Sequence, residues 1–245
     1  MKIVWIAPVG TGRFDDRILS FINRIRRSDV EAEVIHLSPG LPDNLEYHVY
    51  EHMVEDDLLH AIVDYEKKGH DAAIIGCFYD GGLREARELV KMPVIAEEEA
   101  SIHVAATLGH KFSIIVGRRK WLPKMEDNVR VYGLSEKLAS MRIVQFSIEK
   151  IASDRAGYLE AVKRESHLAV VEDGAEVIVL SEEASFDYDD LLDLQAHLGV
   201  PVLDPLIVGW KFAELMADLK RHGIAHSKIG GYEAPPTDEL KRFDC

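Results

Sequence analysis

The sequence contains an internal repeat, and this repeat constrains the fold more than any other feature. The segment KIVWIAPVG, which begins at Lys2, resembles KFSIIVGRR, which begins at Lys111. The segment DAAIIGCFYDGGLREARELVKMPVI from Asp71 resembles AEVIVLSEEASFDYDDLLDLQAHLGVPVL from Ala175. Because two separate segments recur in the same order and at a similar spacing, the chain is predicted to fold as two similar halves related by a pseudo-twofold.

Within each half, short apolar runs alternate with segments whose apolar residues recur at helical spacing. Alternation of this kind predicts βαβ units, and therefore an α/β fold with a mostly parallel sheet in each half. We expect strands at residues 2–7, 72–76, 94–96, 112–116, 177–180 and 200–203, and helices at residues 15–27, 55–68, 83–90, 100–108, 156–173 and 189–198.

The composition narrows the class of partner. Asp and Glu number 43 against 29 Lys and Arg, and the resulting net charge of −14 argues against nucleic acid and anionic membranes. No apolar segment reaches the roughly 18 residues of a membrane span, and the first ten residues lack the features of a signal peptide. The two cysteines, Cys77 and Cys245, imply no disulfide framework, so we expect a cytoplasmic protein that binds a small molecule.

Under the repeat, Cys77 and Glu182 are equivalent, and each follows an apolar strand. In open α/β sheets, ligands bind beyond the carboxyl ends of the strands, where loops lead into helices. If the two halves face one another, the thiol and the carboxyl approach a shared cleft from opposite sides, which suits proton transfer at the two faces of a carbon. Two plainer interpretations stay open: a small buried cysteine, and Glu182 and Glu183 as ordinary acids before a helix.

Arg118 and Arg119 follow the expected strand at 112–116. A pair of guanidinium groups at the carboxyl end of a strand is a natural anchor for a carboxylate or a phosphate. Arginines in such positions are also commonly solvated, and that interpretation carries similar weight.

The sequence contains one candidate metal-binding pattern and lacks several common catalytic motifs. His48, Glu51 and His52 match the H-x-x-E-H pattern of inverted zinc proteases, with the histidines one helical turn apart. No third ligand is evident, so we expect no metal. The G-x-S-x-G, Walker and G-x-G-x-x-G motifs do not occur, which argues against serine hydrolases, nucleotide hydrolases and dinucleotide-binding enzymes.

Three segments resemble one enzyme family. They are GCFYDGGLREAREL (76–89), PVIAEEEASIHVAATLGHKFSIIVG (93–117) and GVPVLDPLIVGWKFAE (199–214), and they are similar to the aspartate/glutamate racemase superfamily, in particular to its hydantoin racemase branch. The resemblance extends from Met1 to about Met216. It implies two α/β halves with the active site in the cleft between them, and a C-terminal helix that packs back on the first half.

These considerations together divide the chain. We expect a first α/β half at 1–98, a second at 99–204, the C-terminal helix at 205–226, and a polar tail at 227–245 that lies beyond the resemblance. Homo-oligomers are expected, because two-domain proteins of this kind often assemble.

The resemblance also implies a chemistry. Members of the family need no cofactor and use two cysteines, one in each half, to exchange a proton at a carbon next to a carbonyl or carboxylate. The first cysteine corresponds to Cys77, whereas Glu182 stands at the second position. The Asn-Pro-Asn-Thr turn of the branch is replaced by Pro8-Val9-Gly10-Thr11, which removes two amide side chains. The residues expected to contact the substrate are Pro8, Thr11, Phe78, Asp80, Gly81, Arg118, Arg119 and Glu183.

The function expected from these observations is that of an isomerase of the racemase or epimerase type, acting on a small anionic or cyclic amide substrate. Glu182 would be the base and Cys77 the acid on the opposite face. Three alternatives stay open: a decarboxylase or lyase that works through an enediolate, a hydrolase in which Cys77 attacks covalently while Glu182 activates water, and a non-catalytic binding protein.

Overall fold

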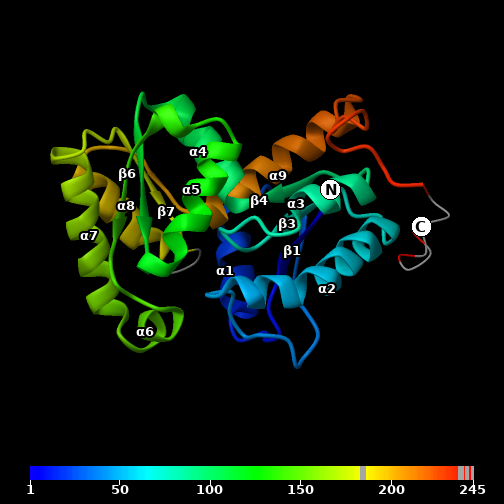
Figure 1. Ribbon diagram of the computed structural model, residues 1–245, viewed down its shortest axis with the longest axis horizontal. Helices are drawn as coiled ribbons and strands as arrows, with labels where there is room; N and C mark the ends of the chain where they lie inside the picture. Colours follow the sequence, from blue (N-terminus) through cyan, green and yellow to red (C-terminus); the bar gives the residue numbers. More distant parts are fainter. Residues whose placement is uncertain (183–185, 237–239, 241–242, 244–245) are drawn as a thin grey trace. The chain divides into compact units, whose positions relative to one another are not determined.

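A computed structural model describes residues 1–182, 186–236, 240 and 243 of the chain (Figure 1). The chain divides into two units. Unit 1 consists of Met1–Gly76, Asp80–Ala96 and Trp210–Cys245, and unit 2 consists of Cys77–Tyr79 and Glu97–Gly209. These limits differ by a few residues from the expected halves at 1–98 and 99–204. The short segment Cys77–Tyr79 belongs to unit 2, although the chain on both sides of it belongs to unit 1.

Unit 1 is built on a parallel four-stranded sheet in the order β2-β1-β3-β4. Its strands are β1 (Lys2–Ala7), β2 (Glu31–His36), β3 (Ala72–Ile75) and β4 (Val94–Ala96), and its helices are α1 (Asp15–Ile25), α2 (His48–Lys67), α3 (Leu83–Leu89) and the C-terminal part of α9 (Pro205–Arg221).

Unit 2 repeats this topology with the order β6-β5-β7-β8. Its strands are β5 (Phe112–Val116), β6 (Leu138–Ile143), β7 (Val177–Leu180) and β8 (Val202–Leu203). Its helices are α4 (Glu97–Leu108), α5 (Leu122–Val131), α6 (Ile148–Ser153), α7 (Arg155–Val171), α8 (Tyr188–Leu198) and the start of α9, and two short 3₁₀ helices are η1 (Arg119–Trp121) and η2 (Ser135–Lys137).

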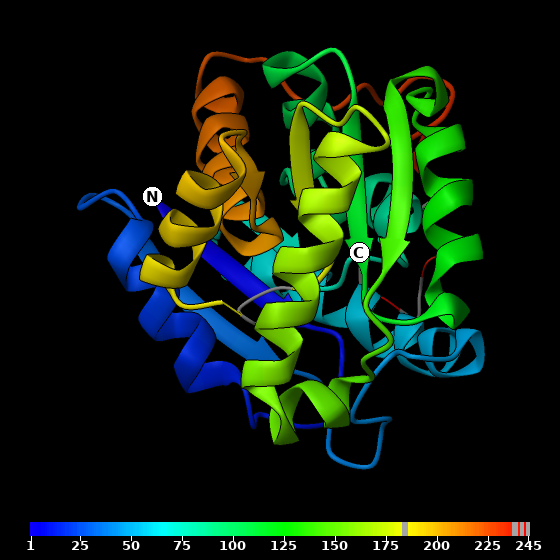
Figure 2. The same ribbon diagram turned by 90° about the vertical axis from the view of Figure 1, so that its left-hand side faces the viewer.

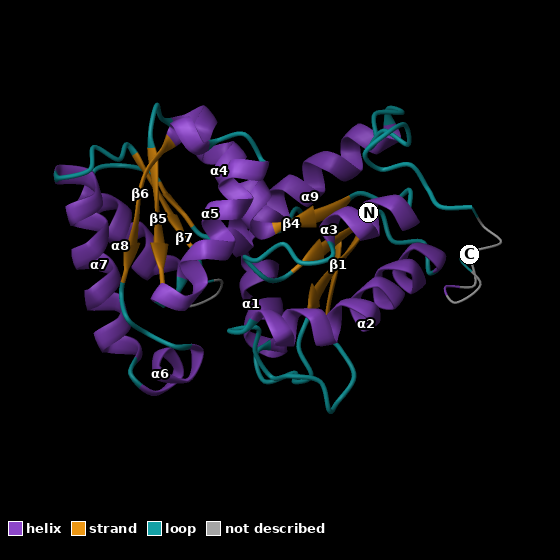
Figure 3. Ribbon diagram, viewed as in Figure 1, coloured by secondary structure: helices purple, strands orange, loops and turns teal. Residues whose placement is uncertain are grey.

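Each sheet has helices on both faces. Right-handed crossovers that run in opposite directions along a sheet place their helices on opposite faces, and α1 and α2 accordingly lie on opposite sides of β1 (Figure 1). In unit 2, α5 and α7 lie on opposite sides of the sheet (Figure 3), and α7 passes in front of the strands in the turned view (Figure 2). Strands covered on both faces are expected to be continuously apolar, and β3, β5 and β7 are buried along their whole length.

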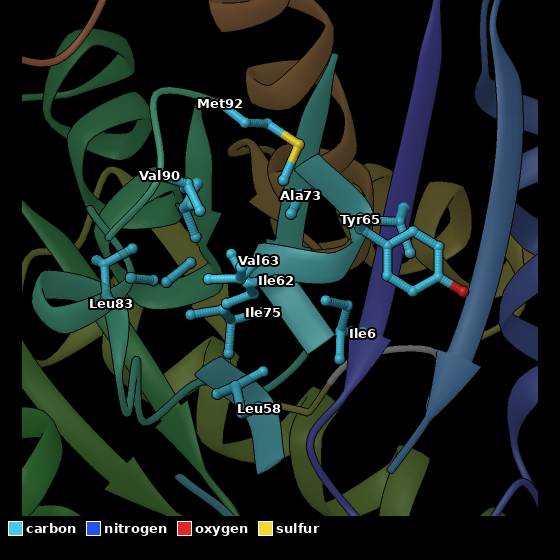
Figure 4. Close-up of a cluster of buried hydrophobic side chains, with 14 of the residues drawn as sticks. Ile6, Leu58, Ile62, Val63, Tyr65, Ala73, Ile75, Leu83, Val90 and Met92 are labelled. Carbon is cyan, nitrogen blue, oxygen red and sulfur yellow. The ribbon is translucent and has the colours of Figure 1, made fainter. Parts of the chain in front are cut away.

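The main apolar cluster of unit 1 lies between its sheet and helices α2 and α3 (Figure 4). The strands contribute alternate residues, because successive side chains point to opposite faces of a sheet. Each fully buried aliphatic side chain stabilises the fold by roughly 1.5–3 kcal/mol. The labelled residues are Ile6, Ala73 and Ile75 from the strands, Leu58, Ile62, Val63 and Tyr65 from α2, and Leu83, Val90 and Met92 from α3 and the segment after it.

The strand ladders confirm the internal repeat. In unit 1, Ile6 near the end of β1 pairs with Ile75 at the end of β3. In unit 2, Ile115 near the end of β5 pairs with Leu180 at the end of β7. The two inner strand pairs therefore end in the same register.

The hydrogen bonds beyond these ladders extend the equivalence by one residue. The first residue after the inner strand donates its amide N–H to the carbonyl of the paired β1 or β5 residue, at 2.9 Å for Gly76 and 3.2 Å for Ser181. The next residue is Cys77 in the first case and Glu182 in the second. The equivalence of these two positions, inferred from the repeat, is thus fixed by backbone geometry.

The strands expected at 2–7, 94–96, 112–116 and 177–180 are confirmed, whereas β2 and β6 were not expected. Both are edge strands with partly exposed residues along EAEVIH and LASMRI. These two strands bury only part of their surface, so they lack the continuous apolar run that marks a strand buried on both faces. The helix expected at 55–68 begins earlier, at His48. Helices α5 and α6 were also missed. Helix α5 buries only Met125 and Val129, and α6 is too short to show apolar residues recurring at helical spacing.

Side-chain contacts join β2 and β6 to the connections that follow them. On β2, Glu33 accepts hydrogen bonds from the Tyr65 hydroxyl at 2.6 Å and interacts with His70 Nε2 at 3.2 Å. Burial and this hydrogen bond raise the pKa of Tyr65 above its ordinary value. On β6, Arg142 donates to both carboxylate oxygens of Asp173, at 2.7 and 2.9 Å.

The beginning of the tail packs against α3 in unit 1. Lys228 Nζ donates to backbone carbonyls at the end of that helix, those of Arg87, of Glu88 at 3.3 Å and of Val90 at 2.7 Å. A cation at this end of a helix also complements the helix dipole. Burial lowers the pKa of Lys228. Tyr232 adds a hydrogen bond from Arg87 at 3.1 Å.

Candidate functional site

The strand order of each unit creates one position where connections leave toward opposite faces. In unit 1 this point lies at the ends of β1 and β3, and in unit 2 it lies at the ends of β5 and β7. Such topological switch points are where α/β sheets bind ligands. The residues expected from the sequence to act on a substrate follow these four strands.

Cys77 is a half-buried thiol rather than part of a disulfide. It follows β3 directly after Gly76, and its segment belongs to unit 2. The next two side chains, Phe78 and Tyr79, are buried in the apolar cluster of unit 2, against residues that include Ile102, Trp121 and Met125. Cys77 itself packs against the same cluster. Two aromatic anchors therefore hold the segment that carries the thiol.

A polar contact also holds this segment. Asn128 of α5 donates one hydrogen bond from Nδ2 to the carbonyl oxygen of Tyr79, at 3.0 Å, and another to Glu98 Oε2 of α4, at 2.7 Å. Glu98 has no exposed surface. These two residues were not singled out in the sequence, where an asparagine on a helix and one of three consecutive glutamates carry no distinguishing signal.

The chain then turns through three residues of unit 1. Asp80 is buried and has a φ of +55°, a left-handed conformation that Asp and Asn adopt more readily than most side chains. Gly82 has a φ of +73° and precedes the first residue of α3. A Cβ on Gly81 would lie 2.7 Å from Glu51 Oε1, so a larger residue there would have to displace the Glu51 side chain.

Glu182 occupies the equivalent position in the second repeat. Only 6% of its surface is exposed, and its Oε1 accepts a hydrogen bond from the Ser181 hydroxyl at 3.3 Å. It belongs to unit 2, as Cys77 does. Glu183, which was expected to contact the substrate, lies outside the described residues.

The two arginines follow β5. Arg118 is half-buried and extended, and Arg119 is exposed in the first turn of η1. The preceding residue, Gly117, packs closely against Trp121. A Cβ at this position would overlap the indole ring. Arg118 thus follows a position where the backbone is closely covered by an aromatic side chain.

The remaining expected contact residues, Pro8 and Thr11, lie in the loop after β1 in unit 1. Pro8 is buried and Thr11 is half-buried, and the Thr11 hydroxyl accepts a hydrogen bond from the amide of Arg13 at 3.4 Å. The expected residues therefore divide between the units: Pro8, Thr11, Asp80 and Gly81 in unit 1, and Cys77, Phe78, Arg118, Arg119 and Glu182 in unit 2.

The histidine pattern on α2 forms an ordinary contact along one turn of the helix. His48 Nδ1 lies 3.8 Å from Glu51 Oε2, one turn along the helix, and the His52 side chain is exposed. Among the residues that the structure describes, no group of three or more potential ligands is arranged to hold a metal ion. In the same described part of the chain, no helix combines the length and apolar character needed to cross a membrane.

Comparison with known proteins identifies the family. The family model described as Asp/Glu/Hydantoin racemase matches residues 3–213. The chain belongs to this family. A hydantoin racemase of Pseudomonas sp. (strain NS671) is 31% identical over 240 residues, covering 98% of this chain and 94% of that protein. The structure of the allantoin racemase from Klebsiella pneumoniae aligns with a TM-score of 0.87 and 26% identity, over 96% of this chain and 94% of that one.

A more distant neighbour shares the fold alone. The crystal structure of arylmalonate decarboxylase aligns with a TM-score of 0.61 at 18% identity, covering 95% of this chain and 97% of that one. The family and the two closer relatives show that this chain is an enzyme of the cofactor-independent racemase type, which moves a proton at a carbon next to a carboxylate or carbonyl. The expectation drawn from the sequence resemblance is confirmed at this level.

Proposed function

We propose that the enzyme racemises a cyclic ureide, a hydantoin or allantoin-like ring, with Cys77 and Glu182 as its proton-transfer pair. The pairing is supported by the equivalent positions of the two residues. Each is the second residue after an inner strand, and the two strands end in the same register with their neighbours. The substrate class is supported by the names of the two closer relatives, a hydantoin racemase and an allantoin racemase.

The proposed reaction removes the proton from the ring carbon next to the carbonyl and returns one to the opposite face. One group takes the proton as base, the electron pair of the C–H bond passes into the carbonyl as an enolate, and the other group protonates the carbon. The enolate oxygen needs hydrogen-bond donors fixed in advance. In this proposal Glu182 stands where the family has its second cysteine.

A thiol and a carboxyl group make the two directions of this reaction chemically unequal, because their ordinary pKa values differ by about four units. Turnover of one enantiomer begins with a Glu182 carboxylate and a Cys77 thiol, and it ends with a carboxyl group and a thiolate. Since two enantiomers have equal free energy, kcat/KM must be equal in both directions. The inequality is therefore expected in kcat and KM separately.

Deuterium exchange tests the pair directly. The wild-type enzyme and the Cys77→Ser and Glu182→Gln variants are incubated with each enantiomer of allantoin and of a 5-substituted hydantoin in deuterium oxide. The wild type is expected to produce the opposite enantiomer with deuterium at the ring carbon. Each variant should lose racemisation by about 10²–10⁴-fold, the usual contribution of a general acid or base. Each should still exchange the enantiomer whose C–H bond faces the remaining group, and the two variants should differ in which enantiomer that is.

Two matched controls distinguish chemistry from folding. Glu160→Gln removes a carboxylate from an exposed position on α7, and Cys245→Ser removes the other thiol. Both should keep wild-type rates. Exchange of both enantiomers by either active-site variant would contradict the assignment of one group to each face. Release of carbon dioxide from a malonate analogue without ureide exchange would instead support a decarboxylase.

The remaining expectations from the sequence need separate measurements. The expected cleft between the two halves, the cytoplasmic location and the homo-oligomeric assembly stay predictions, supported by the family resemblance and by the low cysteine content. Light scattering coupled to size-exclusion chromatography measures the assembly state.

A further inference from the structure

We propose that Asn128 is a positioning residue for Cys77, which it orients by fixing the carbonyl of Tyr79; this inference rests on the proposed role of Cys77. The side-chain NH₂ group of Asn128 donates the two hydrogen bonds already described, to Tyr79 O at 3.0 Å and to Glu98 Oε2 at 2.7 Å. An amide NH₂ group has two N–H donors, so both donors of Asn128 are used.

The orientation of this amide follows from its neighbours. Both partners are oxygen atoms in acceptor positions, a backbone carbonyl and a carboxyl oxygen. If the amide turned over, its own oxygen would face both of them and both hydrogen bonds would be lost. Glu98 has no exposed surface, so water has little access to replace its bond from Asn128. These two hydrogen bonds therefore hold the Asn128 amide in one orientation.

The contact lies at the end of the thiol segment, just before the chain turns back into unit 1. Tyr79 comes two residues after Cys77 and immediately before Asp80, whose left-handed φ of +55° marks a sharp change in chain direction. The side chains of Phe78 and Tyr79 fix the segment on its apolar side. The hydrogen bond from Asn128 acts on the backbone itself, because it holds the carbonyl group of Tyr79.

The three parts joined by Asn128 lie far apart in the sequence but within one unit. Helices α4 and α5 pack together in unit 2 (Figure 3), and the segment Cys77–Tyr79 belongs to the same unit. Asn128 therefore has two separable tasks: it links α5 to α4 through Glu98, and it links α5 to the thiol segment through Tyr79. Small displacements of a reacting group can cost about 10²-fold in rate, so the second task is expected to matter for turnover.

A pair of substitutions separates the two tasks. Asn128→Asp replaces both donors with an acceptor and should break both links. Glu98→Gln alone keeps an acceptor oxygen and should leave both intact. In the double variant Asn128→Asp/Glu98→Gln, the new glutamine amide can donate to the new aspartate, so the link between the helices returns, whereas the Tyr79 carbonyl still lacks its donor.

The readouts are ureide racemisation kinetics, thermal stability, and hydrogen–deuterium exchange of the amides at residues 78–82, all measured on the full-length chain. Asn128→Asp should lower kcat by about 10- to 100-fold with little change in KM and should speed amide exchange in this segment. The double variant should recover thermal stability but neither kcat nor amide protection. Asn23→Asp is the matched control, because Asn23 is exposed and its side-chain oxygen accepts from Arg26 Nε at 2.7 Å, a contact that aspartate keeps.

Recovery of wild-type kcat by the double variant would show that Asn128 only joins the helices, and the proposal would be wrong. Unchanged amide exchange in Asn128→Asp would overturn it as well. Should the wild-type enzyme racemise no ureide, the proposed substrate fails, and the amide exchange and stability measurements still decide the role of Asn128.

Discussion

At the scale of single residues, two glycines beside the candidate site are constrained by tryptophan rings. A Cβ on Gly76, which precedes Cys77, would overlap the indole of Trp5, and a Cβ on Gly117, which precedes Arg118, would overlap that of Trp121. Both rings are buried, so they have little space into which to retreat. The backbone next to the proposed catalytic thiol and next to Arg118, which is expected to contact the substrate, is thus covered closely in both units.

Gly117→Ala should accordingly destabilise the protein by about 1–3 kcal/mol, the usual cost of forcing an extra methyl group into a packed region. Urea denaturation followed by tryptophan fluorescence measures this loss. Gly231→Ala is the control, because nothing lies within 4 Å of an added Cβ there and no left-handed φ is required. Equal stability of the two variants would mean that Trp121 moves aside without cost.

Single residues also show what the sequence could and could not predict about the site. The equivalence of Cys77 and Glu182 was predictable from the repeat. The strand pairs of the two units have the same register, so the residues that follow those strands also occupy equivalent positions. Asn128 was not predictable, since its role depends on three segments that meet only in the folded chain and leave no periodic pattern. The separation of Cys77 from Asp80 between two units was likewise invisible in a continuous loop sequence.

At the scale of elements, the inner strands and the two partly exposed edge strands β2 and β6 differ in how readily they are recognised. The inner strands were found because both of their faces are buried. The edge strands β2 and β6 are instead held by polar contacts, which a hydrophobic pattern does not reveal. Arg142 of β6 contacts Asp173, Glu172 at 2.7 Å and Glu165 at 3.7 Å, all on α7 or the turn after it.

The contact between Arg142 and Asp173 predicts a pH-dependent contribution to stability. The hydrogen bond from Arg142 is the largest influence on Asp173 and lowers the pKa of its carboxyl group. A carboxyl group with a lowered pKa stabilises the folded state above its ordinary pKa, and this contribution is lost as the pH falls through the lowered value. Asp173→Asn should therefore cost about 0.5–1 kcal/mol at pH 7, within the range of partly exposed ion pairs.

The difference between wild type and Asp173→Asn should shrink as the pH falls below about 4. Chemical denaturation at a series of pH values measures it. Asp127→Asn serves as the control, because Asp127 pairs with Arg130 at a largely exposed position and its loss should be close to neutral at every pH. A constant difference for Asp173→Asn across the acidic range would show that the carboxylate is not the stabilising form.

At the scale of the whole molecule, the chain passes between the units without a flexible linker. The three-residue segment Cys77–Tyr79 interrupts unit 1, and helix α9 begins in unit 2 and continues into unit 1. The backbone hydrogen bonds of α9 continue across this division, so we expect the two parts of the helix to unfold together. The sequence indicated two halves but not the places at which the chain crosses between them.

Unfolding should therefore be a single cooperative transition. The three tryptophans report on both units, Trp5 and Trp210 on unit 1 and Trp121 on unit 2. One variant keeps only Trp121 and another keeps Trp5 and Trp210, with phenylalanine at the replaced positions. After correction for the effect of the replacements on overall stability, the urea midpoints of the two variants should be the same. Phe78→Ala, which removes a buried side chain of unit 2, should lower both midpoints together. Separate transitions for the two probes would show that the units unfold independently.

The segment Cys77–Tyr79 finally sets a limit on how this enzyme can evolve. A stretch that leaves one unit for three residues and then returns has a fixed contour length, so an inserted or deleted residue between Gly76 and Gly82 would displace either the thiol or its aromatic anchors. The turns at Gly133 and Gly174 have open space around them and can accept such changes in length. New substrates should therefore be reached through replacements of side chains around Cys77, with variation in loop length confined to the opposite ends of the strands.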